Sequence, residues 1–356
     1  MAAVGVATTC ALFVAGCGAA NEGGGGATEG EGVSGTISGA GASSQQAAMQ
    51  AWIAGFVDAN QGATVNYDPV GSGGGRTQFV EGGVQFAGSD AFLEDEQLEQ
   101  ARERCGGSVI EIPNYVSPIA IVYKLDGVSE LNLAPATIAG IFRGEITTWN
   151  DPAIVADNPG TELPDTAITP VHRSDESGTT ENLTDFLSQA APDVWTDEAD
   201  GNWPIQAGEA AQGTSGVIGA VNAGNGTIGY ADASQAGDLG QANVKLGDQN
   251  VAPTAEAAAQ IFEESQRVEG QGEGSFAYEL NRTAAGGAYP VVLVSYLMAC
   301  ETYPDQAQAD VVKAFLNYVV SPEGQAAAAE AAGSAPLSDT LRSEITPVIE
   351  RISAGA

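Results

Sequence analysis

The sequence predicts an α/β protein built as two lobes, and three observations lead to this fold class. The chain has 356 residues, of which 43% are hydrophobic, so it can fill sizeable cores and is not disordered throughout. From Val33 onward, short β-like runs alternate with helical stretches, which is the pattern of an α/β protein. Two extended apolar segments, Ile110–Pro118 and Gly286–Val294, are the places where we expect the chain to cross between lobes.

The individual elements follow from short apolar β-branched runs and from apolar residues at helical spacing. The expected strands are Thr64–Tyr67, Val109–Ile112, Ile119–Tyr123, Ile168–His172, Thr227–Tyr230 and Val291–Leu297. The expected helices are Gln45–Asn60, Gly75–Glu81, Glu94–Glu103, Pro135–Arg143, Thr180–Gln189, Ser215–Ala223, Thr254–Glu264, Gln306–Val320 and Pro322–Ala332. The last of these is rich in alanine, which favours helix strongly.

The two crossover segments predict how the chain is divided between the lobes. Two prolines in Ile110–Pro118 suppress helix and favour an extended crossover. With two crossovers, one lobe is built from both chain ends and the other from the middle. We therefore assign residues 34–115 and 290–356 to the first lobe and residues 116–289 to the second.

The N-terminus indicates where the protein is located. Residues Ala2–Gly16 are small or apolar, too short a run to span a bilayer, and typical of a secretion signal. Val14–Cys17 resembles a bacterial lipobox, which implies cleavage before Cys17 and lipid attachment to its thiol. We expect a signal peptide over residues 1–16, a glycine-rich tether over residues 17–33, and a lipid-anchored protein on the extracytoplasmic face of the cell membrane.

Two features of this region qualify the signal-peptide interpretation. No Lys or Arg precedes the apolar run, although a signal normally begins with positive charge, so we expect the true start to lie upstream. A buried N-terminal helix with an incidental cysteine is the alternative.

The remaining cysteines suggest a disulfide. Cys10 leaves with the signal and Cys17 takes the lipid, so the folded body keeps Cys105 and Cys300. In an oxidising exterior an even pair indicates a disulfide bond, with two buried free thiols as the alternative.

Charge and composition exclude several classes of partner and site. Lys and Arg total 12 against 46 Asp and Glu, and the resulting net charge of −34 repels nucleic acids and anionic membrane surfaces. The single histidine, His172, rules out a multi-histidine zinc site. None of the three lysines follows a glycine, so no phosphate loop of the nucleotide-binding type is present. We expect no metal and no cofactor.

Glycine-rich stretches with hydroxyl residues lead into three of the expected helices. They are Gly39–Ser43, Gly71–Gly75 and Ser174–Thr180, the last directly after Arg173. The first turn of a helix has N–H groups without intrahelical partners, and the helix dipole adds positive potential there. Small residues let an anion approach this backbone, so three converging starts would form an anion site with little formal charge.

His172 and Ser177 invite an interpretation as a serine hydrolase. However, no G-x-S-x-G motif surrounds Ser177, and His172 should leave its strand on the face opposite Arg173. We therefore expect a binding protein and not an enzyme. A phosphomonoesterase on the same scaffold is the alternative from another class.

Taken in order, several segments resemble the extracytoplasmic phosphate-binding protein of the phosphate ABC transporter (the PstS family). They are Gly39–Ser43, Val65–Tyr67, Gly71–Gly75, Phe86–Asp90, Ile141–Asn150, Arg173–Thr179 and Gly226–Tyr230. Each is weak by itself, but their order and spacing make the match specific from residue 34 to the end. The resemblance implies the periplasmic-binding-protein-like fold, in which two crossover strands form a hinge and two lobes close on one phosphate. It also implies a monomer that delivers phosphate to ABC permease subunits.

The resemblance implies a set of phosphate contacts, carried over by matching motif positions. The donors are Ser43, the backbone at Ser44, Ser72, Arg173, Ser177, Gly178 and Thr179. Asp90 aligns with the aspartate that accepts the ligand's own proton, and Asp175 aligns with an acid that braces the arginine. The family commonly has Thr-Phe where this chain has Ser43-Ser44, so the hydroxyl is kept but an apolar wall of the pocket is lost.

The proton on phosphate gives Asp90 a physical role. Phosphate near neutral pH keeps at least one hydrogen, whereas sulfate has none. A buried carboxylate can accept that hydrogen but would face sulfate as an unpaired like charge. Sites built around a required hydrogen-bond partner reject analogues that lack it by roughly 10⁴–10⁵-fold. A turn acid at Asp90 and a receptor for another oxyanion are the alternatives.

Overall fold

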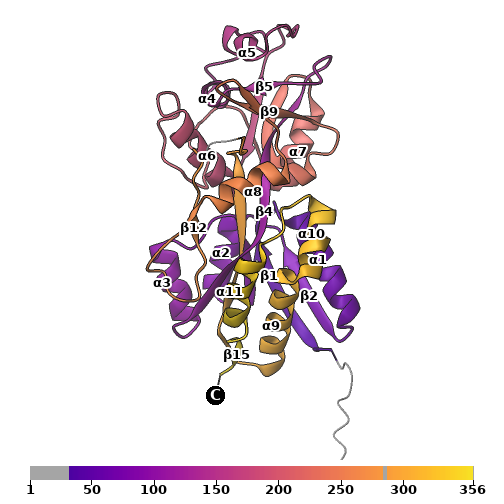
Figure 1. Cartoon of the computed structure of the whole chain (residues 1–356), viewed down its shortest axis with the longest axis vertical. Coiled ribbons are helices and arrows are strands. Elements are labelled where there is room, and N and C mark those ends of the chain that lie inside the picture. The colour runs from indigo at the N-terminus through magenta and orange to yellow at the C-terminus, as the bar shows by residue number, and fades with distance from the viewer. Residues whose placement is uncertain (1–31, 284–286, 356) are drawn as a thin grey trace, which may run out of the picture. The chain divides into compact units, whose positions relative to one another are not determined.

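The computed structural model describes residues 32–283 and 287–355, and most of its strands form one mixed sheet. These strands are β1 (Gly35–Gly41), β2 (Ala63–Asp68), β3 (Phe86–Ser89), β4 (Val109–Lys124), β5 (Asn132–Leu133), β6 (Thr169–Arg173), β7 (Glu209–Ala211), β8 (Thr227–Asp232), β9 (Gly240–Leu246), β10 (Gln249–Val251) and β13 (Val292–Cys300). Their order is β2-β1-β3-β13-β4-β8-β6-β7, and β9 pairs with β4, β5 and β10. Figure 1 labels β1, β2, β4, β5 and β9 of this sheet. Two small sheets pair β11 (Gln266–Arg267) with β12 (Tyr278–Glu279) and β14 (Thr302–Tyr303) with β15 (Ser353–Ala354).

Helices connect these strands. They are α1 (Gln46–Ala59), α2 (Ser72–Val80), α3 (Asp95–Arg104), α4 (Pro135–Phe142), α5 (Pro152–Asp157), α6 (Gly178–Ala190), α7 (Gly213–Ala223), α8 (Ala255–Glu263), α9 (Gln306–Val320), α10 (Pro322–Ala332) and α11 (Asp339–Ile349), with a short 3₁₀ helix, η1, over Ala233–Gln235. Within residues 32–283 and 287–355, none of the helices combines the length and apolar character needed to cross a bilayer.

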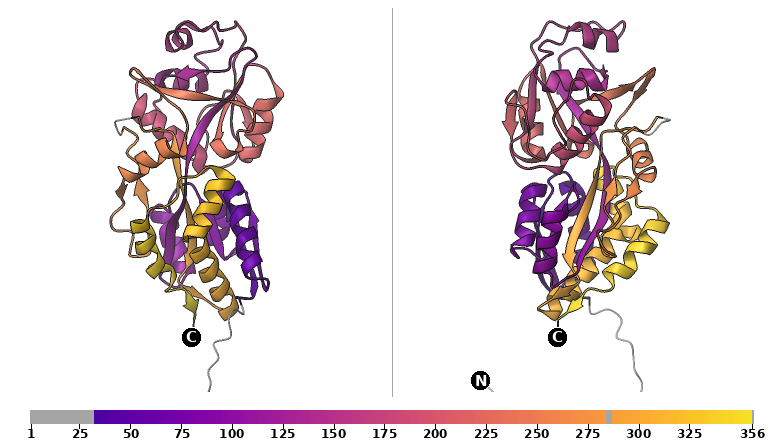
Figure 2. Two further views of the ribbon diagram at one scale, coloured as in Figure 1. Left: turned by 45° about the vertical axis from the view of Figure 1, so that its right-hand side comes forward. Right: turned by 90° about the vertical axis from the view of Figure 1, so that its left-hand side faces the viewer.

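The long strand β4 joins the two halves of the main sheet. Its residues up to Pro118 pair antiparallel with β13, whereas its residues from Ile119 onward pair with β8. Figure 2 shows the purple β4 and the orange β13 side by side from two further directions. The first predicted crossover is thus part of one continuous strand, and the predicted boundaries of the lobes, at residues 115/116 and 289/290, stay a prediction.

Several predicted elements differ from the observed ones in their bounds. The stretches Val109–Ile112 and Ile119–Tyr123 are not two strands, because β4 runs through both. Pro113 lies beside a register shift opposite Ser295/Tyr296 of β13, and Pro118 pairs with Val292. Gly39–Gly41 ends strand β1, and the stretch then leads through Ser43 and Ser44 into α1, as expected. Helix α2 begins at Ser72, so the glycines that follow lie inside its first turns.

The strand directions place several loops at one end of their strands. Strand β1 runs parallel to β2 and β3, and β6 runs parallel to β7 and β8. The carboxyl ends of parallel strands meet at one edge of a sheet, where ligands bind in open α/β folds. The two parallel sets run in opposite directions on either side of β13 and β4, so their carboxyl ends face each other. Ser43 and Ser44 follow β1, Asp90 follows β3, and Arg173 is the last residue of β6. Helices α2 and α7 begin just after β2 and β7.

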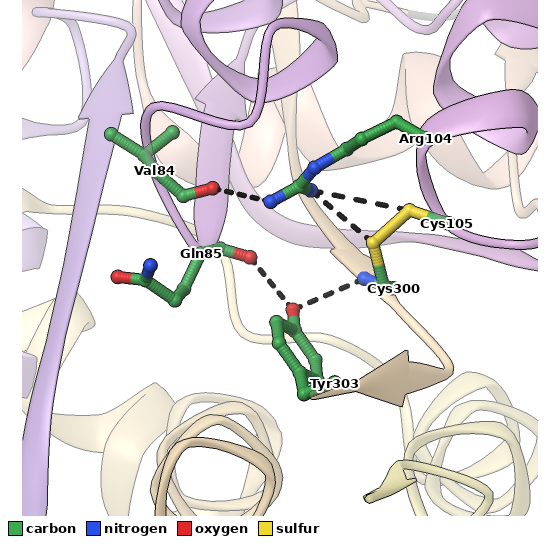
Figure 3. The surroundings of a disulfide bond; sticks show 6 residues. All are labelled: Val84, Gln85, Arg104, Cys105, Cys300 and Tyr303. Carbon is green, nitrogen blue, oxygen red and sulfur yellow. Dashed lines mark hydrogen bonds between the residues drawn. A yellow bond between two sulfur atoms is a disulfide. The ribbon is translucent and has the colours of Figure 1, made fainter. Parts of the chain in front are cut away.

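The disulfide prediction is confirmed. Cys105, which follows α3, is bonded to Cys300 at the end of β13, 195 positions away in the sequence (Figure 3). The two cysteines are nearly buried, at 5% and 3% exposure. Arg104 donates to the carbonyl oxygen of Val84 at 2.7 Å, and Tyr303 donates to that of Gln85 at 2.7 Å. The neighbours of the two cysteines thus also hold the segment just before β3. The bond links segments from the two ends of the folded body.

Candidate anion-binding site

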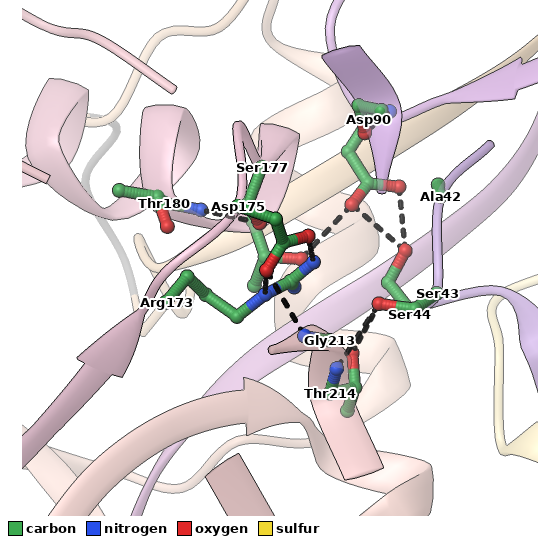
Figure 4. Close-up of polar contacts among 12 residues, drawn as sticks. Ala42, Ser43, Ser44, Asp90, Arg173, Asp175, Ser177, Thr180, Gly213 and Thr214 are labelled. Carbon is green, nitrogen blue, oxygen red and sulfur yellow. Dashed lines mark hydrogen bonds and ion pairs between the residues drawn. The ribbon is translucent and has the colours of Figure 1, made fainter. Parts of the chain in front are cut away.

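The starts of four helices come together around a group of hydroxyl side chains. Figure 4 shows the residues at three of them, α1, α6 and α7. Ser43 and Ser44 precede α1, Ser72 is the first residue of α2, Ser177 caps α6, and Thr214 is the second residue of α7. Hydrogen bonds connect the four starts, some of them through Asp90. Since each first turn carries N–H groups without intrahelical acceptors, the arrangement concentrates positive potential with little formal charge. The convergence expected from the glycine-rich stretches is therefore present, and α7 adds a start that the sequence reasoning had not included.

Two glycines allow the segments to approach this closely. A Cβ atom on Gly178 would lie 2.7 Å from Cβ of Asp90 and 2.8 Å from Oγ of Ser72, distances that no real side chain tolerates. Gly71 has φ +96°, and a Cβ there would lie 2.4 Å from Oδ2 of Asp175. Glycine at these positions is required by close packing of α2 and β3 against the start of α6.

Three serines of the site accept backbone N–H groups through their hydroxyl oxygens. Ser72 Oγ accepts the backbone N–H of Asp90 at 3.1 Å, and Ser177 Oγ accepts that of Thr180 at 3.3 Å. Ser43 Oγ accepts the backbone N–H of Thr214 at 3.0 Å and shares a second hydrogen bond with its hydroxyl. A hydroxyl that accepts through its oxygen keeps its own O–H, which can then be given to an anion.

Asp90 is the acceptor of the site. Its side chain is nearly buried, and its carboxylate accepts hydroxyl hydrogens from Ser44 at 2.7 Å, Thr179 at 3.0 Å, and Ser295. Burial raises the pKa of Asp90, while these three hydroxyls and the charge of Arg173 partly lower it. A carboxylate has about four lone-pair positions, so capacity for one further donor remains.

Arg173 provides the cationic group. It is 3% exposed, and its Nε donates to Oδ1 of Asp175 at 2.8 Å while a terminal nitrogen pairs with Oδ2. Gly213 also donates its N–H to Asp175, at 3.0 Å. Burial alone would raise the pKa of Asp175, but the hydrogen bonds and charge of Arg173 outweigh it, and the pKa is lowered. A guanidinium has five N–H groups, so the braced Arg173 can still offer donors to an anion.

Three polar residues of the site lie outside the predicted set. Thr214 stands at a glycine-rich helix start like those that were recognised, so this pattern could have revealed it. Ser295 lies within the apolar strand β13, and Gln235 donates to the backbone oxygens of Ser43 and Ser44 at 3.0 and 2.7 Å. Neither has a local sequence signal, because each acts on residues about 190 or more positions away.

The arrangement offers no hydrolase geometry around Ser177. The His172 ring stacks on Trp203 at 5.1 Å, and its Nδ1 lies 2.9 Å from the carbonyl oxygen of Arg173. The hydrogen bonds of Ser177 instead cap α6. Among the described residues, no group of three or more His, Cys, Asp or Glu side chains is placed to hold a metal ion.

The fold and the site together define a class of protein. A family model described as a PBP superfamily domain matches residues 26–323, and the chain is similar in structure to solved phosphate-binding proteins. One of these is a high-affinity periplasmic phosphate-binding protein solved with bound phosphate (TM-score 0.72, 23% identity, 88% of this chain and 93% of that one). Another, from Stenotrophomonas maltophilia, gives a TM-score of 0.69 at 21% identity over 88% of this chain and 94% of that one. These likenesses show the two-lobed α/β fold of the superfamily.

The curated relatives narrow the class to a family. Phosphate-binding protein PstS2 of Mycobacterium bovis is 35% identical over 88% of this chain and 86% of its own length. PstS 3 of Mycobacterium tuberculosis is 35% identical over 99% of this chain and 98% of its own length. PstS of Xylella fastidiosa is 31% identical over 79% and 76%. The chain belongs to the PstS family, and all of these relatives are described as binding proteins, in agreement with the expectation that it is not an enzyme.

Proposed function

We propose that this protein binds inorganic phosphate between two lobes and delivers it to the permease of an ABC transporter. One lobe would comprise residues 34–115 and 290–356, and the other residues 116–289. The observation that carries the proposal is one buried acceptor, Asp90, among oriented hydroxyl and guanidinium donors. Phosphate uses both kinds of partner, since its bare oxygens accept and its remaining proton is donated.

The proposed contacts divide by their chemistry. Donors are the hydroxyls of Ser43, Ser72 and Ser177, the first-turn backbone N–H groups of Gly178 and Thr179, the backbone at Ser44, and the guanidinium of Arg173. Asp90 would accept the proton of phosphate, and Asp175 would brace Arg173. Ser44 and Thr179 gain a further role, because their hydroxyls already donate to Asp90 and fix its orientation. A phenylalanine at position 44 could not supply this hydrogen bond.

Closure of the lobes would remove the ligand from water. Ser43, Ser72 and Asp90 lie in the proposed first lobe, whereas Arg173 and the start of α6 lie in the second. Donors from both sides reach one ligand only when the lobes meet, so binding energy favours the closed state. The two strands β4 and β13, which pair over Val109–Pro118 and Val292–Cys300, are the proposed hinge.

The anchor is proposed from the sequence, since residues 1–31 lie outside the described part of the chain. Val14–Cys17 is the motif that supports lipid attachment to Cys17 and a location on the extracytoplasmic membrane face. Cys17→Ser should release the protein into the medium or leave it unprocessed. A variant that stays membrane-bound at its normal size would contradict the anchor.

The test of the proposed ligand is a calorimetric titration of phosphate-free protein with phosphate, arsenate and sulfate. We expect phosphate to bind, arsenate to compete because it shares geometry and protons with phosphate, and sulfate to be rejected. Equal affinity for sulfate, or no binding of phosphate, would overturn the proposal. Release of phosphate from a chromogenic ester, abolished by Ser177→Ala, would favour an esterase instead.

A further inference from the structure

Asn182 connects the start of α6 to the end of β3. Its Nδ2 donates both hydrogens, one to the carbonyl oxygen of Gly178 and one to that of Asp90, each at 2.8 Å. The side chain is 7% exposed, so water does not readily replace these partners. Gly178 lies one helical turn away in α6, whereas Asp90 lies 92 positions away in the sequence. Asn182 therefore holds the backbone of Asp90 against the helix start that faces its carboxylate.

Arg282 fixes the orientation of this amide. One terminal nitrogen donates to Oδ1 of Asn182 at 2.5 Å, and Nε pairs with Asp185 on the same helix. The other terminal nitrogen donates to the carbonyl oxygens of Pro290 and Val292, at 3.0 and 2.9 Å, where β13 begins. Arg282 is 4% exposed. One buried guanidinium thus joins α6 to the first residues of a proposed hinge strand.

We propose that Asn182 and Arg282 are positioning residues that stabilise the closed state by holding Asp90 against α6. This inference rests on the proposed function, because it concerns closure on phosphate. The hydrogen bond to Asp90 spans the two proposed lobes, so it forms only when they meet. Arg282 holds the amide in place beforehand, which reduces the ordering cost of that contact. A contact of this kind acts mainly on the rate of ligand release.

Asn182→Asp tests the donor role of the amide most directly, because it keeps the size of the side chain and an acceptor for Arg282. It replaces the two donors with an oxygen that faces two carbonyl oxygens. Asn158 offers a matched control: it is 2% exposed, and its Nδ2 donates to the carbonyl oxygens of Ile154 and Asn132, both at 2.8 Å. All of its partners lie within residues 132–158, far in sequence from Asp90.

The experiment measures phosphate affinity by calorimetry, phosphate release by stopped flow, and thermal stability. We expect Asn182→Asp to weaken phosphate binding about 10- to 100-fold, mostly through faster release. The ratio of phosphate to sulfate affinity should stay the same, since the carboxylate of Asp90 keeps its partners. Asn158→Asp should lower stability but bind phosphate like the wild type.

A second variant, at Arg282, tests the same role. Arg282→Lys keeps the positive charge, but a lysine lacks the planar guanidinium that contacts four partners at once. This variant should therefore also speed phosphate release. It provides the test if Asn182→Asp does not fold. Wild-type release in the folded variants, or loss of selectivity against sulfate, would overturn the positioning role. A wild-type protein that does not bind phosphate would instead refute the proposed function, and this inference with it.

Discussion

Replacing Asp90 by Asn tests which group distinguishes phosphate from sulfate. The variant keeps the shape of the side chain and one acceptor oxygen, but it removes the negative charge. The hydroxyls of Ser44, Thr179 and Ser295, which donate to the carboxylate, can rotate to accept from the new amide nitrogen. The fold around position 90 should therefore survive, and the change in binding should report on charge.

The magnitude follows from the burial of Asp90, which is 3% exposed. Two unit charges about 4 Å apart interact by about 4 kcal/mol at an effective dielectric constant near 20. Sulfate carries no proton to offset this repulsion, so losing the carboxylate should improve its binding by up to about 10³-fold. Phosphate loses one charge-assisted hydrogen bond but can still donate to the amide oxygen, so its affinity should change by about tenfold or less.

The assay is calorimetric titration of both anions against wild-type protein and variants at constant ionic strength. Asp157→Asn is the matched control, because Asp157 is also buried and accepts from Thr137 at 2.6 Å and from the N–H of Ala134 at 2.9 Å. It should leave both affinities unchanged. If sulfate stays excluded in Asp90→Asn while phosphate still binds, Asp90 is a turn acid and the selectivity lies elsewhere.

Three further predictions concern the cation, the disulfide and a buried acid. Arg173→Ala should weaken phosphate binding about 10- to 150-fold in the same titration, because a charge-assisted hydrogen bond contributes roughly 1.5–3 kcal/mol. Removing the bond between Cys105 and Cys300 should lower the free energy of unfolding by up to about 5 kcal/mol in urea denaturation, because a cross-link 195 positions apart restricts the unfolded chain. Burial raises the pKa of Glu111 to about 7 from 4.5, so the folded state binds its proton more tightly than the unfolded state. The stabilising contribution of protonated Glu111 is therefore complete below about pH 4.5, and it falls by about 3 kcal/mol as the pH rises through 7. Glu111→Gln cannot lose a proton, so its free energy of unfolding, measured at pH 5 and pH 8, should not show this fall.

Each of these has a contrary outcome. Unchanged phosphate affinity in Arg173→Ala would remove that residue from the site. Free thiols at Cys105 and Cys300 in a denaturing thiol assay would contradict the disulfide. A difference in stability between Glu111→Gln and the wild type that does not grow with pH would mean that Glu111 stays charged at pH 5.

The sequence alone determined the fold class and the kinds of group in the site. Helices with clear apolar spacing, such as α1, α9 and α10, were predicted to within a residue or so of their ends. Strand β1 was missed because its sequence, Gly-Thr-Ile-Ser-Gly-Ala-Gly, has little apolar alternation, and helix α11 was missed with Pro347 inside it. Local propensity is weak at such segments, so pairing with β2 and β3 decides the structure of β1.

In the site, too, the sequence determined some features and only the tertiary structure determined others. Glycine-rich helix starts beside hydroxyl residues predict donors for an anion. The sequence shows them because the free N–H groups of a helix start depend only on neighbouring residues. Only the tertiary structure decided which hydroxyls donate and which accept. It also decided that Ser44 donates to Asp90, and that Ser295 donates to the same carboxylate from 205 positions away. A hydroxyl can act in either sense, and the partner that chooses between them is brought by the fold from a distant part of the chain.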